Sequence, residues 1–272
     1  MCEREYRNKE WLKEQFDKYK TPSEVAKVTG YPRTCITRYA TKYEIYSVKF
    51  NRDKTNHVNE TYFANIDTAT KAYFLGFIIA DGNMYQRDNG KYQFSIKIKN
   101  TDKDILYKFA DAVEFPKDKI TEREENRKGS ITKCAEIKIY NQEFCSHLIN
   151  LGVIPRKTGK EYMPNIKEEF KKDFIRGFID GDGWISKDGF QLGFGSSSKE
   201  LVESIKDYIL ETLDIDLTIH QDLIYTVKSY KRKNIYQMLK HFYYEGCVAL
   251  DRKYNLANIK KQELIEDLIG SL

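Results

Sequence analysis

The sequence predicts an α+β protein built from two pseudo-symmetric halves of element order αββαββα, preceded by a small all-α unit. Three observations support this prediction. The stretch 65–85 recurs as 165–185, with Asp81 and Asp182 in register at a period of 101 residues. Segments with strand-like alternation follow each copy, whereas residues 9–46 show only helical spacing. A period this long indicates duplicated half-domains rather than a solenoid of short repeats.

Length and composition exclude several classes of protein. The chain has 272 residues, of which 40% are hydrophobic, 14% aromatic and 32% charged. Such a length is typical of about two domains, and the aromatic content argues against disorder. No run of 18 apolar residues occurs, so we expect no membrane span. The net charge is +5, and residues 1–60 hold 13 Lys/Arg against 9 Asp/Glu. This modest basic excess is compatible with a nucleic-acid partner without proving one.

The cysteines and the N-terminus indicate a cytoplasmic protein. The five cysteines form no Cys-x-x-Cys pair, and their odd number fits reduced thiols better than a disulfide framework or a zinc site. The first residues, Met1-Cys2-Glu3-Arg4-Glu5, lack the apolar stretch of a secretory signal.

Residues 1–46 are expected to form a helix-turn-helix unit. A first amphipathic helix begins near Lys9, and Thr21-Pro22-Ser23 is typical of the start of a second helix. Gly30 suits a tight turn, and Ile36 lies where it would bury the third helix. The helix after Pro32 would present four polar side chains to phosphates and base edges: Arg33, Thr34, Thr37 and Arg38. A small helical bundle with no role in DNA binding would show the same pattern.

Residues 47–61 lack periodicity and read as a basic linker, with Lys49, Arg52 and Lys54 among them. Such a linker could lie along DNA or serve only as a tether. The two halves then occupy residues 62–157 and 158–272.

The repeated helices are apolar nearly all round, so both are expected to be buried. Gly76 and Gly177 lie in the middle of these helices, where glycine costs roughly 1 kcal/mol relative to alanine. Two helices packed back to back would explain both glycines, because the absence of Cβ permits close approach. Each helix then ends in Asp-Gly, and we expect the glycine to stop the helix in a left-handed conformation.

The two aspartates predict a metal-dependent site. A carboxylate is disfavoured at a helix C-terminus, and packing the helices together would add repulsion between Asp81 and Asp182. A divalent cation would relieve both effects, and carboxylates with backbone carbonyls suit Mg²⁺. A metal held there could support phosphodiester cleavage. A single Asp-Gly pair would be an ordinary turn, but two copies in register after matching buried helices favour a functional site.

The strand that follows the first repeated helix has one polar face. Tyr92, Phe94, Ile96 and Ile98 alternate with residues that are cationic or polar, namely Lys91, Gln93, Ser95, Lys97 and Lys99. A second strand is predicted near 134–140, with strands of the other half near 190–195 and 223–230. Lysines on such a strand face often serve only solubility.

The motifs resemble those of the LAGLIDADG homing endonucleases. The two name-giving motifs would be Phe74-Leu-Gly-Phe-Ile-Ile-Ala-Asp-Gly82 and Ile175-Arg-Gly-Phe-Ile-Asp-Gly-Asp-Gly183. The stretches 151–157 and 250–254 are also similar to the family. Two motifs in one chain imply a pseudo-symmetric monomer whose strands form a DNA-binding saddle. The N-terminal unit resembles accessory domains of phage- and intron-associated members, which implies the cytoplasm of a bacterial or phage-infected cell.

The resemblance also implies roles for individual residues. Asp81 and Asp182, at the eighth motif position, would be the catalytic metal ligands, assisted by the carbonyls of Ala80 and Gly181. Lys138 and Lys228 match each other and would lie near the scissile phosphates. Lys99 would orient water, and its counterpart would be Gly195 or Ser196, a departure from symmetry. The sixth position, Ile79 in one copy and Asp180 in the other, is not the expected ligand.

The resulting hypothesis is a site-specific endonuclease that makes a double-strand break in a long asymmetric DNA target. Mg²⁺ would be its cofactor, with Mn²⁺ able to substitute. Its partner would be double-stranded DNA, and it would need no small-molecule cofactor and no membrane. Two alternatives stay open: a catalytically silent DNA-binding regulator on the same fold, and an intron RNA maturase.

Overall fold

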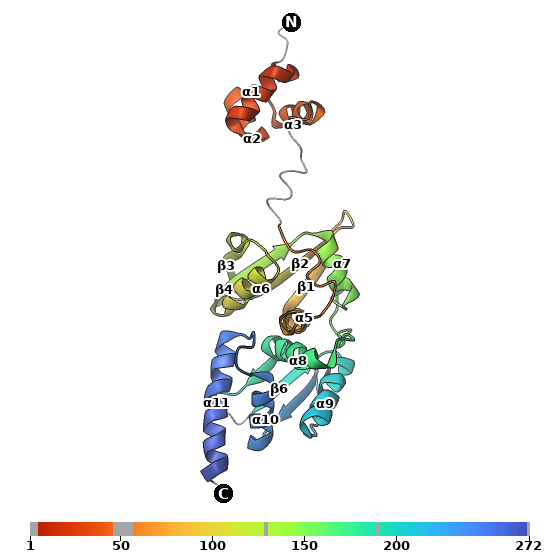
Figure 1. Ribbon diagram of the computed structural model, residues 1–272, viewed down its shortest axis with the longest axis vertical. Coiled ribbons are helices and arrows are strands. Elements are labelled where there is room, and N and C mark those ends of the chain that lie inside the picture. Colours follow the sequence, from red (N-terminus) through yellow and green to blue (C-terminus); the bar gives the residue numbers. More distant parts are fainter. Residues whose placement is uncertain (1–4, 46–56, 128–129, 189–190, 271–272) are drawn as a thin grey trace. The chain divides into compact units, whose positions relative to one another are not determined.

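The computed structural model describes residues 5–45, 57–127, 130–188 and 191–270. It divides the chain into two compact units, Met1–His57 and Val58–Leu272 (Figure 1). Most of the linker expected at 47–61 lies outside the described residues. The linker was expected to extend to residue 61, but the larger unit begins earlier: Val58 is only 9% exposed and belongs to its core.

The smaller unit contains the three predicted helices, α1 (Lys9–Tyr19), α2 (Pro22–Thr29) and α3 (Arg33–Lys42). A 3-10 turn that was not predicted, η1 (Glu5–Arg7), precedes them. Thr21 caps α2, since its Oγ1 accepts a hydrogen bond from the amide of Glu24 and donates one to the Glu24 carboxylate. Gly30 ends α2 in the left-handed region, at φ +72°. Leu12, Phe16, Val25, Ile36 and Ala40 are among the side chains that form its separate core. The predicted helices and turn are therefore present, while their role in DNA binding stays a prediction.

The larger unit contains the predicted duplication. The first half comprises α5 (Ala69–Asp81), β1 (Gly82–Gln86), β2 (Tyr92–Lys99), η2 (Asn100–Asp102), α6 (Asp104–Ala112), η3 (Lys117–Lys119), β3 (Thr121–Arg127), β4 (Ser130–Ile139) and α7 (Gln142–Asn150). The second comprises α8 (Glu168–Asp182), β5 (Gly183–Ile185), β6 (Leu192–Ser196), α9 (Lys199–Leu213), β7 (Ile219–Gln221), β8 (Tyr225–Ser229) and α10 (Arg232–Phe242), followed by α11 (Asp251–Gly270). The expected order αββαββα is confirmed in both halves.

Each half has one four-stranded antiparallel sheet, in the orders β1-β2-β4-β3 and β5-β6-β8-β7. Helices α5 and α8 lie side by side where the two halves meet (Figure 1). One apolar core extends through both halves, so each half lacks a separate core of its own. The halves are structural repeats within a single domain.

The glycines of α5 and α8 allow the two backbones to touch. A Cβ at Gly76 would lie 1.9 Å from the carbonyl oxygen of Phe174, and one at Gly177 would lie 1.9 Å from that of Tyr73. No side-chain rotation relieves a clash with a backbone atom. This packing confirms the prediction that the two glycines allow the buried helices to approach closely.

The left-handed helix stop expected at the Asp-Gly pairs is wrong. Gly82 (φ −73°, ψ 147°) and Gly183 (φ −104°, ψ 176°) are extended, because each is already the first residue of a strand. Glycine is required there for a different reason: an added Cβ would lie 2.5 Å from the Ile78 oxygen or 2.7 Å from the Ile179 oxygen. Each helix thus leads directly into a strand without a loop.

The strand register relates the two sheets residue by residue. Gly82 pairs with Ile96 and Gly183 with Phe194, so Ile96 and Phe194 are equivalent. One residue earlier, Ser95 pairs with Lys138 and Gly193 pairs with Lys228. Lys138 and Lys228 are therefore equivalent, as the sequence predicted. The same register makes Ser197 the counterpart of Lys99, instead of Gly195 or Ser196.

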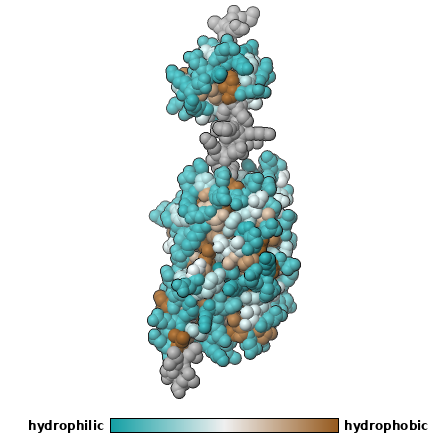
Figure 2. Space-filling model, viewed as in Figure 1, coloured by the Kyte–Doolittle hydropathy of each residue, from teal (hydrophilic) through white to brown (hydrophobic). Residues whose placement is uncertain are grey.

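The surface of the larger unit is mostly hydrophilic in the view of Figure 2, with small separate apolar patches. Among the described residues, no helix combines the length and apolar character needed to cross a membrane. Cys35, Cys134, Cys145 and Cys247 are free thiols.

Candidate active site

Asp81 and Asp182 come together at the C-terminal ends of α5 and α8. An ideal Cβ at Gly181 would lie 2.3 Å from the Ala80 Cβ and 3.4 Å from the Asp81 Oδ2, which shows how closely the helix ends approach. Both aspartates reach solvent. The crossing of two glycine-bearing helices therefore places two carboxylates at one exposed point between the halves.

The surroundings disfavour two ionised carboxylates. Burial, followed by repulsion from Asp182, raises the pKa of Asp81 to about 6, while Lys253 and Lys157 oppose the increase. Burial likewise raises the pKa of Asp182, against the attraction of Lys157. This is the electrostatic pattern that a bound cation would relieve.

Two lysines that sequence reasoning missed bind the carbonyls at these helix ends. Lys157 Nζ donates to the carbonyl oxygens of Ile79 (2.5 Å) and Ala80 (3.1 Å). Lys253, only 3% exposed, donates to those of Ile179 (2.6 Å) and Asp180 (2.8 Å), and to Gly183 (2.7 Å).

Both lysines suit the negative ends of the helix dipoles. Burial lowers the pKa of Lys253 to about 8 and also lowers that of Lys157. The signal was available in the sequence, because Arg156-Lys157 and Arg252-Lys253 each follow the last strands of their half.

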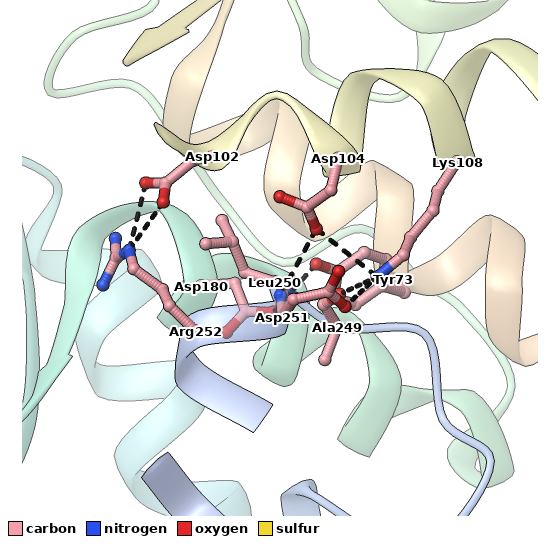
Figure 3. A network of polar contacts seen from close by, with 9 residues as sticks. All are labelled: Tyr73, Asp102, Asp104, Lys108, Asp180, Ala249, Leu250, Asp251 and Arg252. Atoms are coloured by element: carbon pink, nitrogen blue, oxygen red, sulfur yellow. Dashed lines mark hydrogen bonds and ion pairs between the residues drawn. The ribbon is translucent and has the colours of Figure 1, made fainter. Parts of the chain in front are cut away.

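Asp180 fixes the second helix end from inside the core. It is 1% exposed, and its carboxylate accepts hydrogen bonds from the hydroxyls of Tyr73 (2.8 Å) and Tyr243 (2.8 Å) and from the amide of Leu250 (2.7 Å). Figure 3 shows Asp180 next to Tyr73 and the segment that begins α11. The corresponding residue of the first half is Ile79, so this anchor exists in one half only.

A polar cavity of about 350 Å³ opens beside Asp81. Lys97, Lys99 and Gly181 also line it, which brings four of the residues predicted for the site together. Lys138 and Lys228 do not line this cavity. Lys138 instead forms an ion pair with Glu136 (3.1 Å), and Lys228 lies 5.5 Å from the ring centroid of Tyr230. Their catalytic role stays a prediction.

The polar face of the first sheet is partly neutralised by ion pairs. Lys97 Nζ lies 2.9 Å from Glu125 Oε1, and Arg123 contacts Glu136 at 2.8 Å. Lys91 is exposed and Gln93 half-buried, but Ser95 is only 6% exposed, because it lies between neighbouring strands on the same face. Little of Ser95 can therefore contact DNA.

Three of the four residues predicted for DNA binding on α3 are exposed, and these are Arg33, Thr34 and Arg38. Thr37 is half-buried, and its hydroxyl donates to the Arg33 carbonyl within the helix (2.9 Å). The expectation that all four side chains point outward is therefore wrong for Thr37, and DNA binding by the other three stays a prediction.

The residues present fit a hydrated Mg²⁺ better than a metal held by protein ligands alone. In the described part of the chain, no three His, Cys, Asp or Glu side chains are grouped to hold a metal ion. The protein would supply the Asp81 and Asp182 carboxylates, leaving positions for water and phosphate oxygens, as Mg²⁺ prefers. Of the two carbonyls predicted to assist, that of Ala80 already accepts from Lys157. Buried Glu161 carries an Oε2 atom with no hydrogen-bond donor among the described residues, and its charge raises the pKa of Asp182.

The second half is similar to a known protein family. Residues 169–261 match the family model of the LAGLIDADG-like domain. The chain is 25% identical over 245 residues to an uncharacterized protein of Methanocaldococcus jannaschii, a match that covers 83% of this chain and 81% of that protein. It is also 25% identical over 204 residues to DNA-directed RNA polymerase subunit Rpo1C of the same organism. That match covers 74% of this chain but only 21% of the subunit.

Among solved structures, the homing endonuclease I-WcaI bound to its DNA recognition sequence has a similar fold. The TM-score is 0.51 at 12% identity, over 72% of this chain and 91% of that one. At this identity the likeness concerns the fold alone.

Proposed function

We propose that this chain is a site-specific DNA endonuclease. Residues 169–261 match the LAGLIDADG-like domain, and the mixed α+β fold is similar to that of the homing endonuclease I-WcaI. It makes a double-strand break in a long asymmetric target by Mg²⁺-dependent phosphodiester hydrolysis. The observation that carries this proposal is the pair of mutually repelling carboxylates, Asp81 and Asp182, held at the ends of two helices in backbone contact. The solved relative I-WcaI is described with its recognition DNA, which supports DNA as the substrate class.

In this proposal the chain works as a pseudo-symmetric monomer. Asp81 and Asp182 would hold a cation, which would supply activation of water and stabilisation of the leaving oxygen. Lys157 and Lys253 fix the helix ends that carry these carboxylates. The polar sheet faces hold the duplex by its backbone, and Lys99, beside Asp81, orients water. Arg33, Thr34 and Arg38 of α3 extend the contact into an adjacent groove.

The deciding experiment uses the DNA that flanks the gene. The flanks are joined without the intervening insertion, and this junction is incubated with the protein and Mg²⁺, with an EDTA control. We expect both strands to be cut near the junction in Mg²⁺ and neither in EDTA. Tight binding without cutting, in Mg²⁺ or Mn²⁺, would indicate a regulator instead. Absence of both binding and cutting, with binding to folded intron RNA, would indicate a maturase.

Metal binding is expected to weaken as the pH falls through about 6. A carboxyl must lose its proton to hold a cation, and the pKa of Asp81 is about 6 rather than about 3.9. Below pH 6 the apparent affinity for Mn²⁺ should therefore fall by about tenfold per pH unit. Calorimetric titrations between pH 5 and 8 measure this. An affinity that stays constant across this range would show that Asp81 does not hold the cation.

A further inference from the structure

The start of α11 brings an arginine of the second half into the cavity of the first. Arg252 lines the cavity that also contains Asp81 and Lys99. Its Nε lies 2.9 and 3.0 Å from the two carboxylate oxygens of Asp102, a residue of η2 in the first half. A site beside Asp81 is thus built from both halves of the repeat.

The surrounding contacts fix this arginine firmly. Lys108 of α6 donates to the Ala249 carbonyl (2.9 Å) and to Asp251 (2.5 Å), while Asp180 accepts from the Leu250 amide (2.7 Å). Figure 3 shows these contacts holding the residues on the N-terminal side of Arg252. The backbone that carries Arg252 is therefore anchored to the first half and to the buried core of α8.

The ion pair leaves the outer edge of the guanidinium available. Asp102 engages only Nε (Figure 3). The two terminal nitrogens have no hydrogen-bond partner among the described residues. A cation in the first turn of a helix is also disfavoured by the helix dipole, so helix stability does not explain an arginine at this position. An arginine fixed through one edge presents the other as a fork that matches a phosphate.

The charges of the cavity point to the same ligand. Lys97 is paired with Glu125 and Asp102 with Arg252. The carboxylate of Asp180 is satisfied by three hydrogen bonds on its core side. Among the described residues that line the cavity, the charged groups left without a partner are therefore Asp81, Lys99 and the outer edge of Arg252. A cation at Asp81 together with an anionic oxygen between Lys99 and Arg252 would balance them. The volume of about 350 Å³ is far above the ~10–15 Å³ that one water requires.

We propose that Arg252, positioned by Asp102, binds a phosphate of the DNA strand that is cut beside Asp81. This inference rests on the proposed function. Arg252 lies outside both LAGLIDADG motifs, residues 74–82 and 175–183. It also makes the two cleavage sites unequal. The corresponding residue of the first half, Arg156, is exposed, has a left-handed backbone (φ +56°) and has no acidic partner among the described residues.

The first test compares the rates at which the two strands are cut. Arg252→Lys keeps the positive charge but loses the fork, and it should slow one strand ten- to a hundredfold more than the other under single-turnover conditions. Asp102→Asn should slow the same strand by a smaller factor, because Arg252 is still present but loses the ion pair that positions it. Arg156→Lys is the matched control and should leave the ratio unchanged. Equal slowing of both strands by Arg252→Lys would overturn the proposal.

The second test does not depend on cleavage. Binding of the junction duplex is measured in EDTA at several salt concentrations, with thermal melting of each variant to confirm folding. Arg252→Gln should weaken binding and reduce the slope of log affinity against log salt by about one, the change expected for one phosphate contact. An unchanged slope in a folded variant overturns the proposal even if the wild-type chain cuts no DNA. Absence of cutting by the wild-type chain would count against the endonuclease alone.

Discussion

Double-strand cleavage is expected to disappear when either Asp81 or Asp182 is replaced by asparagine. The substitution keeps the shape of the side chain but removes a charged metal ligand, so the rate should fall by about 10³-fold or more, equivalent to roughly 4 kcal/mol of activation free energy. DNA binding should persist, because the sheet faces are unchanged. Single-turnover cleavage and gel-shift assays on the same duplex measure the two effects separately.

Stability provides a second readout for the same variants. An acid whose pKa is higher in the folded state than in the unfolded state destabilises folding at pH values above that pKa. Asp81→Asn should therefore raise the unfolding free energy at pH 7 in the absence of metal, since the pKa of Asp81 is about 6 when folded. Asp207→Asn, on an exposed face of α9, is the matched control and should change neither property. Normal cutting by both site variants would show that the site has been misassigned.

The largest loss of stability is expected from alanine at Gly76 or Gly177. The added Cβ would lie 1.9 Å from a backbone oxygen of the facing helix, and the helices would have to separate along their whole contact. Each helix buries eight consecutive residues there, so the cost should be about 4 kcal/mol or more, and cleavage should be lost with it. Chemical denaturation followed by circular dichroism measures the change.

Gly90→Ala provides the control for this prediction. A Cβ at Gly90 would have nothing within 4 Å, and its cost comes only from the positive φ of +76°. That cost is roughly 1–2 kcal/mol. A Gly76→Ala variant no less stable than Gly90→Ala would show that the two helices do not pack in backbone contact.

Periodicity alone predicted most of the secondary structure. The alternation of residues 91–99 required one apolar face, and Phe94, Ile96 and Ile98 are indeed buried in the core. The repeat required the second half to follow the order of the first, which it does. The N-terminal helices were predictable for a similar reason, since Thr21 and Gly30 act locally on the backbone at the two ends of α2.

The burial of charged side chains on α8 could not be predicted from the sequence. Arg176 is 1% exposed, contacts Asp173 at 2.7 Å and donates to the carbonyl oxygens of Val248 and Phe242. Its guanidinium also lies 5.1 Å from the ring centroids of Tyr73 and Tyr244. A charge is buried only where partners from other segments surround it, and no local pattern shows those partners.

The candidate site divides in the same way. The sequence by itself predicted that Asp81 and Asp182 lie close together. Each stands at the end of a repeated buried helix, and the glycine inside each helix indicated that the two helices pack against each other. The repeated Arg-Lys pairs were visible in the sequence, but only the tertiary structure shows that Lys157, Lys253 and Arg252 lie beside the two aspartates. Only the tertiary structure shows, too, that Lys138 and Lys228 do not line the cavity beside Asp81. The physical reason is range. Helix ends and strand alternation are encoded within a few residues. The surroundings of a charge instead depend on segments about 70 or more positions away in the chain, and their hydrogen bonds form only when the two halves pack on one core.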